Sequence, residues 1–374
     1  MQNVARVALA IDYTGNGYRA LLPIAMREPS LLNAAVAVAA AHYSRWHGTA
    51  DTVSRRYLQT ASKALFARLS DPVQVMSPIT LASMLLHVSY EVFSGSPRWK
   101  GHYDAIRGWI ASRGDCSDLD PFLKTWVCLL DTQSSLNLGQ PAMLELESWM
   151  DPSAQASDSI DALFGCSSKL PKLMWTASRL YAASKAGLVS RQELCQQAAD
   201  LQSQIRATSM VPTAQPGVSI TCDKASTALT ATLGITDGEL ERRMVAAAEI
   251  FRHASHIYVH RIVYGPEYPL PPDLYASLEA GKQCLVEIPD ALGPGANLGW
   301  CLVVLGAEME SPEDREYITS RWEALHRLGM YNTKNGQKIV EEVWKHADMV
   351  KQGWATAVRW QDIMQVIGES QILV

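Results

Sequence analysis

The chain has 374 residues, of which 48% are hydrophobic and 19% are charged, and its formal net charge is −5. Such a mildly acidic chain lacks the basic surface that follows a nucleic-acid backbone, and no stretch reaches the ~18 uncharged apolar residues that a membrane span requires. The N-terminal MQNVARVALAIDY has too short an apolar part for a secretory signal. We therefore expect an intracellular protein with a sizeable core that contacts neither membrane nor nucleic acid directly.

Helical spacing of apolar residues recurs along almost the whole chain. It predicts helices over residues 18–27, 30–46, 52–70, 77–93, 99–112, 121–136, 169–185, 191–208, 237–264, 272–287, 298–309, 313–328 and 359–367, with a further apolar stripe over 339–350. Two segments rich in Pro, Ser, Gln and Gly, 137–158 and 209–223, are predicted to be loops. Since no convincing run of alternating strand residues occurs, the pattern predicts an all-α fold in a single domain, 1–374.

The helix predicted over 313–328 has a clear start signal. Ser311 and Pro312 precede it, and a serine hydroxyl caps a helix while proline fits its first position. Glu308 stands just before this start, at the end of an apolar segment. Because a buried carboxylate needs a partner, we expect a structural ion pair between Glu308 and Arg315.

Five segments resemble one known family when they are taken in order. They are 16–46 (NGYRALLPIA…), 80–114, 253–265 (HASHIYVHRIVYG), 298–344 (LGWCLVVLGAEMES…) and the pair Arg359-Trp360. In this order they resemble the regulatory domain of fungal zinc-cluster transcription factors. The resemblance spans essentially the whole chain. It implies a large helical domain of a kind that binds small molecules and controls the transcription of genes.

The family's six-cysteine DNA-binding module is absent from these residues. The seven cysteines are all at least twelve residues apart and show no zinc-ligand spacing; they stand at positions 116, 128, 166, 195, 222, 284 and 301. Two hypotheses therefore stay open. One is the effector-sensing half of a nuclear regulator that binds a hydrophobic terpenoid, sterol or polyketide. The other is a stand-alone cytoplasmic cyclase or isomerase of fungal secondary metabolism, pericyclase-like and free of any cofactor, which holds a precursor in a reactive shape.

Both hypotheses require a hydrophobic pocket. Eleven Trp and thirteen Met against five Phe favour such a pocket, because Trp offers a rigid face and Met adapts to irregular ligands. The candidate lining residues are Trp99, Ile106, Trp109, Trp175, Tyr258 and Trp300. If the chain is an enzyme, His102 and Tyr103 are the candidate catalytic residues. Under both hypotheses the expected partner of the chain is a hydrophobic small molecule. The family resemblance also allows a homodimer.

Three histidines, His253, His256 and His260, share one helical face. The outer two are about 10 Å apart along a helix axis, too far for one zinc ion, so we expect them to pack between helices. The glycine-rich segment 293–299 lacks the Lys-Ser/Thr of a phosphate-binding loop. The sequence therefore predicts neither a metal site nor a cofactor.

Overall fold

The computed structural model describes residues 2–8, 16–150, 160–210, 230–231, 233–267, 269–289 and 291–368. Within these ranges the regular structure is helical, and extended pairing is limited to one isolated bridge between Ile160 and Ser167. The all-α fold predicted from the sequence is confirmed. No helix in the described ranges is long and apolar enough to cross a bilayer.

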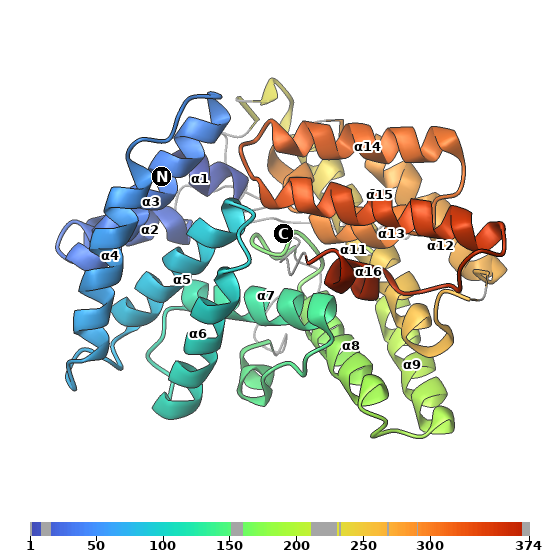
Figure 1. The fold of residues 1–374 in the computed structure, drawn as a ribbon, viewed down its shortest axis with the longest axis horizontal. Helices are drawn as coiled ribbons and strands as arrows, with labels where there is room; N and C mark the ends of the chain where they lie inside the picture. The colour runs from blue at the N-terminus through green and yellow to red at the C-terminus, as the bar shows by residue number, and fades with distance from the viewer. Residues whose placement is uncertain are drawn as a thin grey trace.

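The N-terminal helices form one end of the molecule, drawn in blue to teal in Figure 1. They are α1 (Gln2–Val7), α2 (Gly17–Ala25), α3 (Pro29–Trp46), α4 (Ser54–Leu69), α5 (Pro78–Phe93) and α6 (Trp99–Arg113). The next helix, α7 (Pro121–Leu138), is buried at every residue from Trp126 onward. It packs against α5 and against α8 (Leu170–Lys185), and so connects the two ends of the fold through the core.

The C-terminal helices form the opposite end, in yellow through orange to red in Figure 1. They are α11 (Asp237–Tyr264), α12 (Pro272–Val286), α13 (Gly299–Gly306), α14 (Pro312–His326), α15 (Asn332–Lys351) and α16 (Trp360–Val366). Helix α9 (Arg191–Arg206) packs on α8 and α11, and the described residues also form two short 3-10 segments, η1 (Leu144–Met150) and η3 (Gly293–Gly295).

The long helix α11 organises this end. Its first turn is capped by Thr236, whose side chain accepts the amide hydrogen of Glu239, and it ends at Gly265, where φ is 69°. A positive φ suits glycine because no Cβ clashes there. Helix α11 packs against α9, α12 and α13, so its carboxyl end lies among the C-terminal helices.

A continuous apolar cluster runs through the molecule from Val4 to Met364. Every residue of α13 is buried, and Trp300 in that helix is 0% exposed. Trp344 of α15 donates its indole N–H to the carbonyl of Gly306 at 2.7 Å, which fastens α15 to the end of α13. The apolar residues of α13, α14 and α15 therefore pack in the core.

Several helix ends differ from prediction by a few residues, and one predicted loop contains helical residues. The sequence predicted a loop over 137–158, but α7 continues to Leu138 and residues Leu144–Met150 form η1. The polar composition of residues 137–158 gave no sign of this 3-10 helix. Its side chains Leu146 and Met150 are buried and hold it against the core. Residues 151–158 of that loop, and 211–223 of the loop predicted over 209–223, lie outside the described residues.

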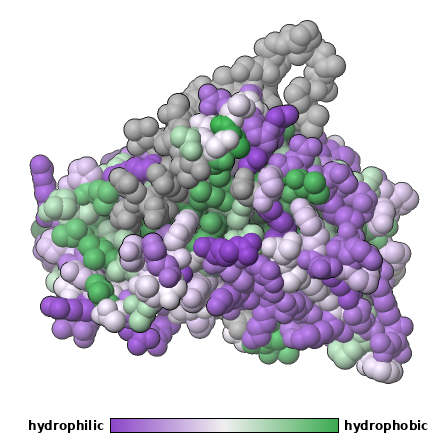
Figure 2. Space-filling model, turned by 90° about the horizontal axis from the view of Figure 1, so that it is seen from above, coloured by the Kyte–Doolittle hydropathy of each residue, from purple (hydrophilic) through white to green (hydrophobic). Residues whose placement is uncertain are grey.

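Hydrophilic residues cover much of the surface visible in Figure 2, while apolar residues gather toward the end of the molecule formed by the N-terminal helices, at the left. Large apolar side chains that are exposed at this end include Met26, Tyr43 and Phe66. A large pocket lies at the other end, among the C-terminal helices.

Candidate functional site

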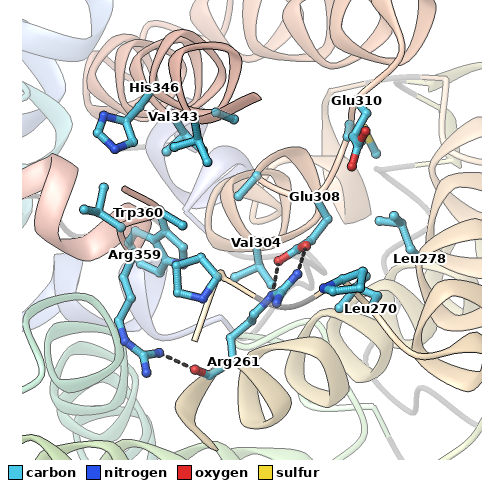
Figure 3. A pocket seen from close by; sticks show the side chains of 18 of the residues that line it. Arg261, Leu270, Leu278, Val304, Glu308, Glu310, Val343, His346, Arg359 and Trp360 are labelled. Carbon is cyan, nitrogen blue, oxygen red and sulfur yellow. Dashed lines mark hydrogen bonds and ion pairs between the residues drawn. The ribbon is translucent and has the colours of Figure 1, made fainter. Parts of the chain in front are cut away.

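A pocket of about 650 Å³ lies among the C-terminal helices. Helices α11 and α13 end beside it, α12, α14 and α15 contribute to its sides, and α16 with the preceding segment contributes another wall (Figure 3). Its apolar walls include Leu270, Leu278, Val304, Met309, Val343, Val350, Trp360 and Ile363. The volume falls within the range of about 300–1,000 Å³ that is typical of small-molecule sites.

An ion pair lies in the middle of this pocket (Figure 3). Nε and Nη2 of Arg261 are 2.8 and 2.5 Å from Oε1 and Oε2 of Glu308, a bidentate geometry. The two side chains are only 16% and 14% exposed. Arg261 also donates from Nη1 to the carbonyl of Gly265 at 2.7 Å, so its guanidinium is fixed at the end of α11.

Both partners lie at the carboxyl end of a helix, where the helix dipole affects their opposite charges differently. Arg261 lies in the last turn of α11, where the carbonyl ends of the helix favour a cation. Glu308 follows the carboxyl end of α13, where the same field disfavours a carboxylate. The position of Glu308 therefore depends on its pairing with Arg261.

The predicted pair between Glu308 and Arg315 is wrong. Arg315 instead holds Asp348 of α15, at 2.8 and 2.9 Å, and its guanidinium stands 5.5 Å from the ring centre of Trp344. This contact lowers the pKa of Asp348, chiefly through the hydrogen bonds from Arg315. The turn between α13 and α14 directs Glu308 toward α11 and Arg315 toward α15, which residue spacing alone did not reveal.

A second guanidinium lies on the same wall. Arg359, just before α16, donates from Nη2 to the carbonyl of Ile262 at 3.1 Å and from Nη1 to the carbonyl of Arg261. It thereby caps the end of α11. Among the described residues it forms no ion pair with a carboxylate, so the wall made by Arg261, Glu308 and Arg359 carries two cations and one anion.

The mouth of the pocket carries its own ion pairs. Lys282 bonds Asp314 at 2.8 Å, and Lys351 bonds Glu310 at 2.8 Å. Glu310 is 77% exposed, which places this pair at the solvent edge. Lys282 also bonds Glu279 at 3.1 Å, and Glu267 is a further acidic residue of the lining, so acidic residues outnumber lysines along the pocket.

Of the six predicted lining residues, Tyr258 is the one along this pocket. Its hydroxyl donates to the carbonyl of Leu136 at 2.9 Å, and its ring centre is 5.6 Å from that of Trp300, one layer deeper. The other members of the set pack in the core: Trp99, Ile106, Trp109, Trp175 and Trp300 are all 0–5% exposed. The structure does not bring these five together around the pocket.

The candidate catalytic residues lie on α6, away from the pocket. Tyr103 is 1% exposed and donates its hydroxyl to Asp131, which is itself 0% exposed and accepts the amide hydrogen of Met143 at 2.9 Å. Burial raises the pKa of both Tyr103 and Asp131. The ring of His102 is 5.4 Å from that of His87, and burial lowers its pKa. This group acts as a core contact between α6 and its neighbours.

The three histidines of α11 lie between helices. His256 places Nδ1 3.0 Å from the hydroxyl of Ser277 and Nε2 3.1 Å from Nη1 of Arg206, so it bridges α12 and α9. Burial lowers the pKa of each of the three to about 4. In the part of the chain that the structure describes, no three His, Cys, Asp or Glu side chains gather as metal ligands would.

Sequence reasoning missed Arg261 as a member of the site. One indication of such a residue was present in the sequence. Glu308 stands at the end of an apolar helix, and a buried carboxylate there needs a cationic partner. Arg359 stood in a segment used for the family resemblance, yet its carbonyl partners lie 97 and 98 residues earlier in the chain, beyond any local pattern.

Comparison with known proteins gives one match. The model of a family described as the fungal specific transcription factor domain matches residues 1–373. No curated protein and no solved structure matches the chain.

Proposed function

Because the chain belongs to the fungal specific transcription factor domain family, we propose that it is the effector-sensing part of a transcription regulator. Its effector is a small, largely apolar metabolite, such as a terpenoid, sterol or polyketide, and the pocket at the ends of α11 and α13 binds it. The observation that carries the proposal is the pocket itself, which combines about 650 Å³ of space, apolar walls and a central ion pair.

A ligand in the pocket would contact several helices at once. Leu278 belongs to α12, Val304 to α13, Val343 to α15 and Ile363 to α16, and all four line the pocket. A ligand that touches all four favours the arrangement in which they enclose it, and the population of that arrangement rises by the ligand's differential affinity. This gives an apolar effector a physical route to a changed regulator surface.

The second hypothesis from the sequence, a cofactor-free cyclase or isomerase, has less support at this pocket. The charged groups of its inner wall are bonded to one another or to backbone carbonyls, as Arg261 and Arg359 show. His102 and Tyr103, on which the hypothesis relies, do not line it. Binding rather than turnover is therefore the function we propose.

Native mass spectrometry of protein purified from a fungal host tests the proposal. The wild type should carry a small molecule, and Ala347→Trp, which fills the pocket from α15, should lose it. The matched control is Met349→Trp on the same helix, since Met349 is 40% exposed and does not line the pocket. Equal ligand retention by Ala347→Trp would contradict the pocket assignment, and a product distinct from an added precursor would favour the enzyme hypothesis.

A regulator of this family acts in the nucleus, and we propose that location for this chain too. DNA contact would then come from a module outside the present sequence. A homodimer also stays a proposal, which light scattering at micromolar concentration tests directly.

A further inference from the structure

The outer face of helix α4 is basic. Arg55, Arg56 and Lys63 are exposed on it, and the sequence of the helix contains neither Asp nor Glu. The end of the molecule around it has the same bias, since residues 16–113 contain eleven Lys and Arg against five Asp and Glu, whereas the whole chain has a formal net charge of −5. Positive charge is therefore concentrated at the N-terminal end, where it attracts acidic partners.

The three exposed bases of α4 face away from the rest of the fold. Helix α4 lies at the outer edge of the molecule in Figure 1 and packs against α3 and α5. Its buried residues form one stripe, made of Ser54, Ala61, Leu65 and Arg68. Arg56 and Lys63 lie on the opposite side of the helix. Among the described residues these exposed bases form no ion pair with a carboxylate, in contrast to Arg68, which bonds Glu28 at 2.9 Å.

Large apolar side chains lie beside the bases. Phe66, three residues after Lys63 on the outer side of α4, is 72% exposed. Met26 is 73% exposed, and the ion pair between Glu28 and Arg68 holds the turn that carries it near the end of α4. These two apolar residues and the three bases are called the α4 patch below. A surface that combines bases with apolar side chains complements a partner that is both acidic and apolar.

We propose that the α4 patch binds an acidic amphipathic helix of a partner protein. Arg56 and Lys63 are seven residues apart, which is about 10 Å along the helix axis. Two acidic residues seven apart on a partner helix have the same spacing. Such a helix can therefore lie along α4 and meet both bases, while its apolar residues contact Phe66. The patch is at the opposite end of the molecule from the pocket, so this inference does not depend on ligand binding there.

Other acidic partners fit the α4 patch less well. A nucleic-acid duplex would leave Phe66 and Met26 without apolar contacts, and three bases are few beside the about six to ten phosphate contacts of a typical DNA-binding protein. An anionic bilayer would find only two large apolar side chains to bury in this patch. A helix offers carboxylates and apolar side chains side by side, which is the combination that the patch requires.

Fluorescence anisotropy with labelled peptides of about 18 residues tests the proposal. The first peptide consists of Glu, Ala and Leu, with the leucines on one helical face. The second has Lys in place of every Glu, and the third has the composition of the first in an order that spreads the leucines around the helix. The first should bind the wild-type protein with a Kd of about 10 μM, and the other two at least about tenfold more weakly. Equal binding of the Lys peptide, or no binding of the Glu peptide at about 200 μM, would overturn the proposal.

Variants locate the binding on the patch. Arg56→Glu/Lys63→Glu should weaken binding of the Glu peptide by at least about tenfold, and Phe66→Ala should weaken it by about fivefold. The control Lys185→Glu/Arg327→Glu makes the same change in net charge at exposed positions outside the patch, and it should bind like the wild type. Equal losses in the two double variants would show that net charge, and not the α4 patch, governs binding. A DNA duplex or phosphatidylserine vesicles that bind the wild type tighter than the Glu peptide does, and lose binding in Arg56→Glu/Lys63→Glu, would overturn the class of partner.

Discussion

Glu308 directs both carboxylate oxygens at Arg261, which stands 47 residues earlier in the chain, at 2.8 and 2.5 Å. The pair joins the end of α11 to the turn after α13 in a setting where both side chains are about one-sixth exposed. Its contribution to stability therefore lies between that of a surface pair and that of a fully buried one.

We expect either Arg261→Gln or Glu308→Gln to lower the free energy of unfolding by about 2 kcal/mol, because each leaves one charge without its partner. The double variant should recover most of that loss, since two neutral side chains can hydrogen-bond in the same place. Urea denaturation of the four proteins gives the coupling energy. Additive single effects would mean that the two side chains do not interact in solution.

Arg359 fixes the segment before α16 to the end of α11, through the carbonyls of Arg261 and Ile262. Arg359→Met removes two charge-assisted hydrogen bonds, so α16 should open more often, by about 1.5–3 kcal/mol in the free energy of local opening. Amide hydrogen exchange across α16 measures this. The exposed Arg327→Met serves as control. Unchanged exchange in Arg359→Met would show that α16 is held by its apolar contacts alone.

Stability should depend on pH through the buried histidines. Burial lowers the pKa of His253 and His256 to about 4, below the ordinary value of 6.5, so between pH 6.5 and 4 the unfolded chain binds more protons than the folded one. The free energy of unfolding must then fall as the pH falls through this window. Each such histidine contributes a slope of up to about 1.4 kcal/mol per pH unit.

Replacing His256 by Gln should make that slope shallower, as urea denaturation at several pH values between 4.5 and 7 would record. Gln202→Ala is a matched control, because Gln202 donates to the carbonyl of His256 at 3.3 Å but carries no titrating proton. The control should lower stability equally at every pH. An unaltered slope in His256→Gln would mean that this histidine is not buried in its neutral form.

Tyr103 should prove to be a stabilising residue rather than a ligand-binding one. Its hydroxyl bonds the buried carboxyl group of Asp131, so Tyr103→Phe leaves that group short of a donor and should cost about 1–3 kcal/mol of stability. Retention of a small molecule in native mass spectrometry should stay the same, because Tyr103 does not line the pocket. A stable Tyr103→Phe with impaired binding would restore Tyr103 as a candidate site residue.

The helices were predictable because their apolar stripes and caps are local signals. Ser311 accepts the amide hydrogen of Asp314 at 3.0 Å as the predicted cap, and the predicted helix over 313–328 is observed as α14. The pocket was not predictable in the same way, since its walls come from elements far apart in the sequence. The sequence singled out Glu308 correctly as a carboxylate in need of a cation, but a partner on α11 has no local signature.

The tryptophans that the composition singled out mostly fill the core and do not line the pocket. Trp99 and Trp300 are each 0% exposed and fill the core, whereas the pocket is lined mainly by aliphatic and charged side chains. A large aromatic residue buries more apolar area than any other, so the interior of a helical domain is its commonest place. The content of Trp and Met therefore indicated which residues fill the core, and it gave little information about where the pocket lies.

Two glycines in helices offer a test of the packing around α14 and α15. A Cβ at Gly336 would lie 2.4 Å from Cη2 of the buried Trp322, whereas a Cβ at the exposed Gly108 of α6 would meet no atom within 4 Å. Gly336→Ala should therefore destabilise the fold by about 1–3 kcal/mol through overpacking. Gly108→Ala should stabilise it by about 0.5–1 kcal/mol, because alanine loses less backbone freedom in a helix. Opposite shifts in thermal midpoint would confirm that Trp322 is seated on Gly336. Stabilisation by both substitutions would show that the indole ring packs elsewhere and that the α14–α15 interface, which borders the pocket, is looser than described.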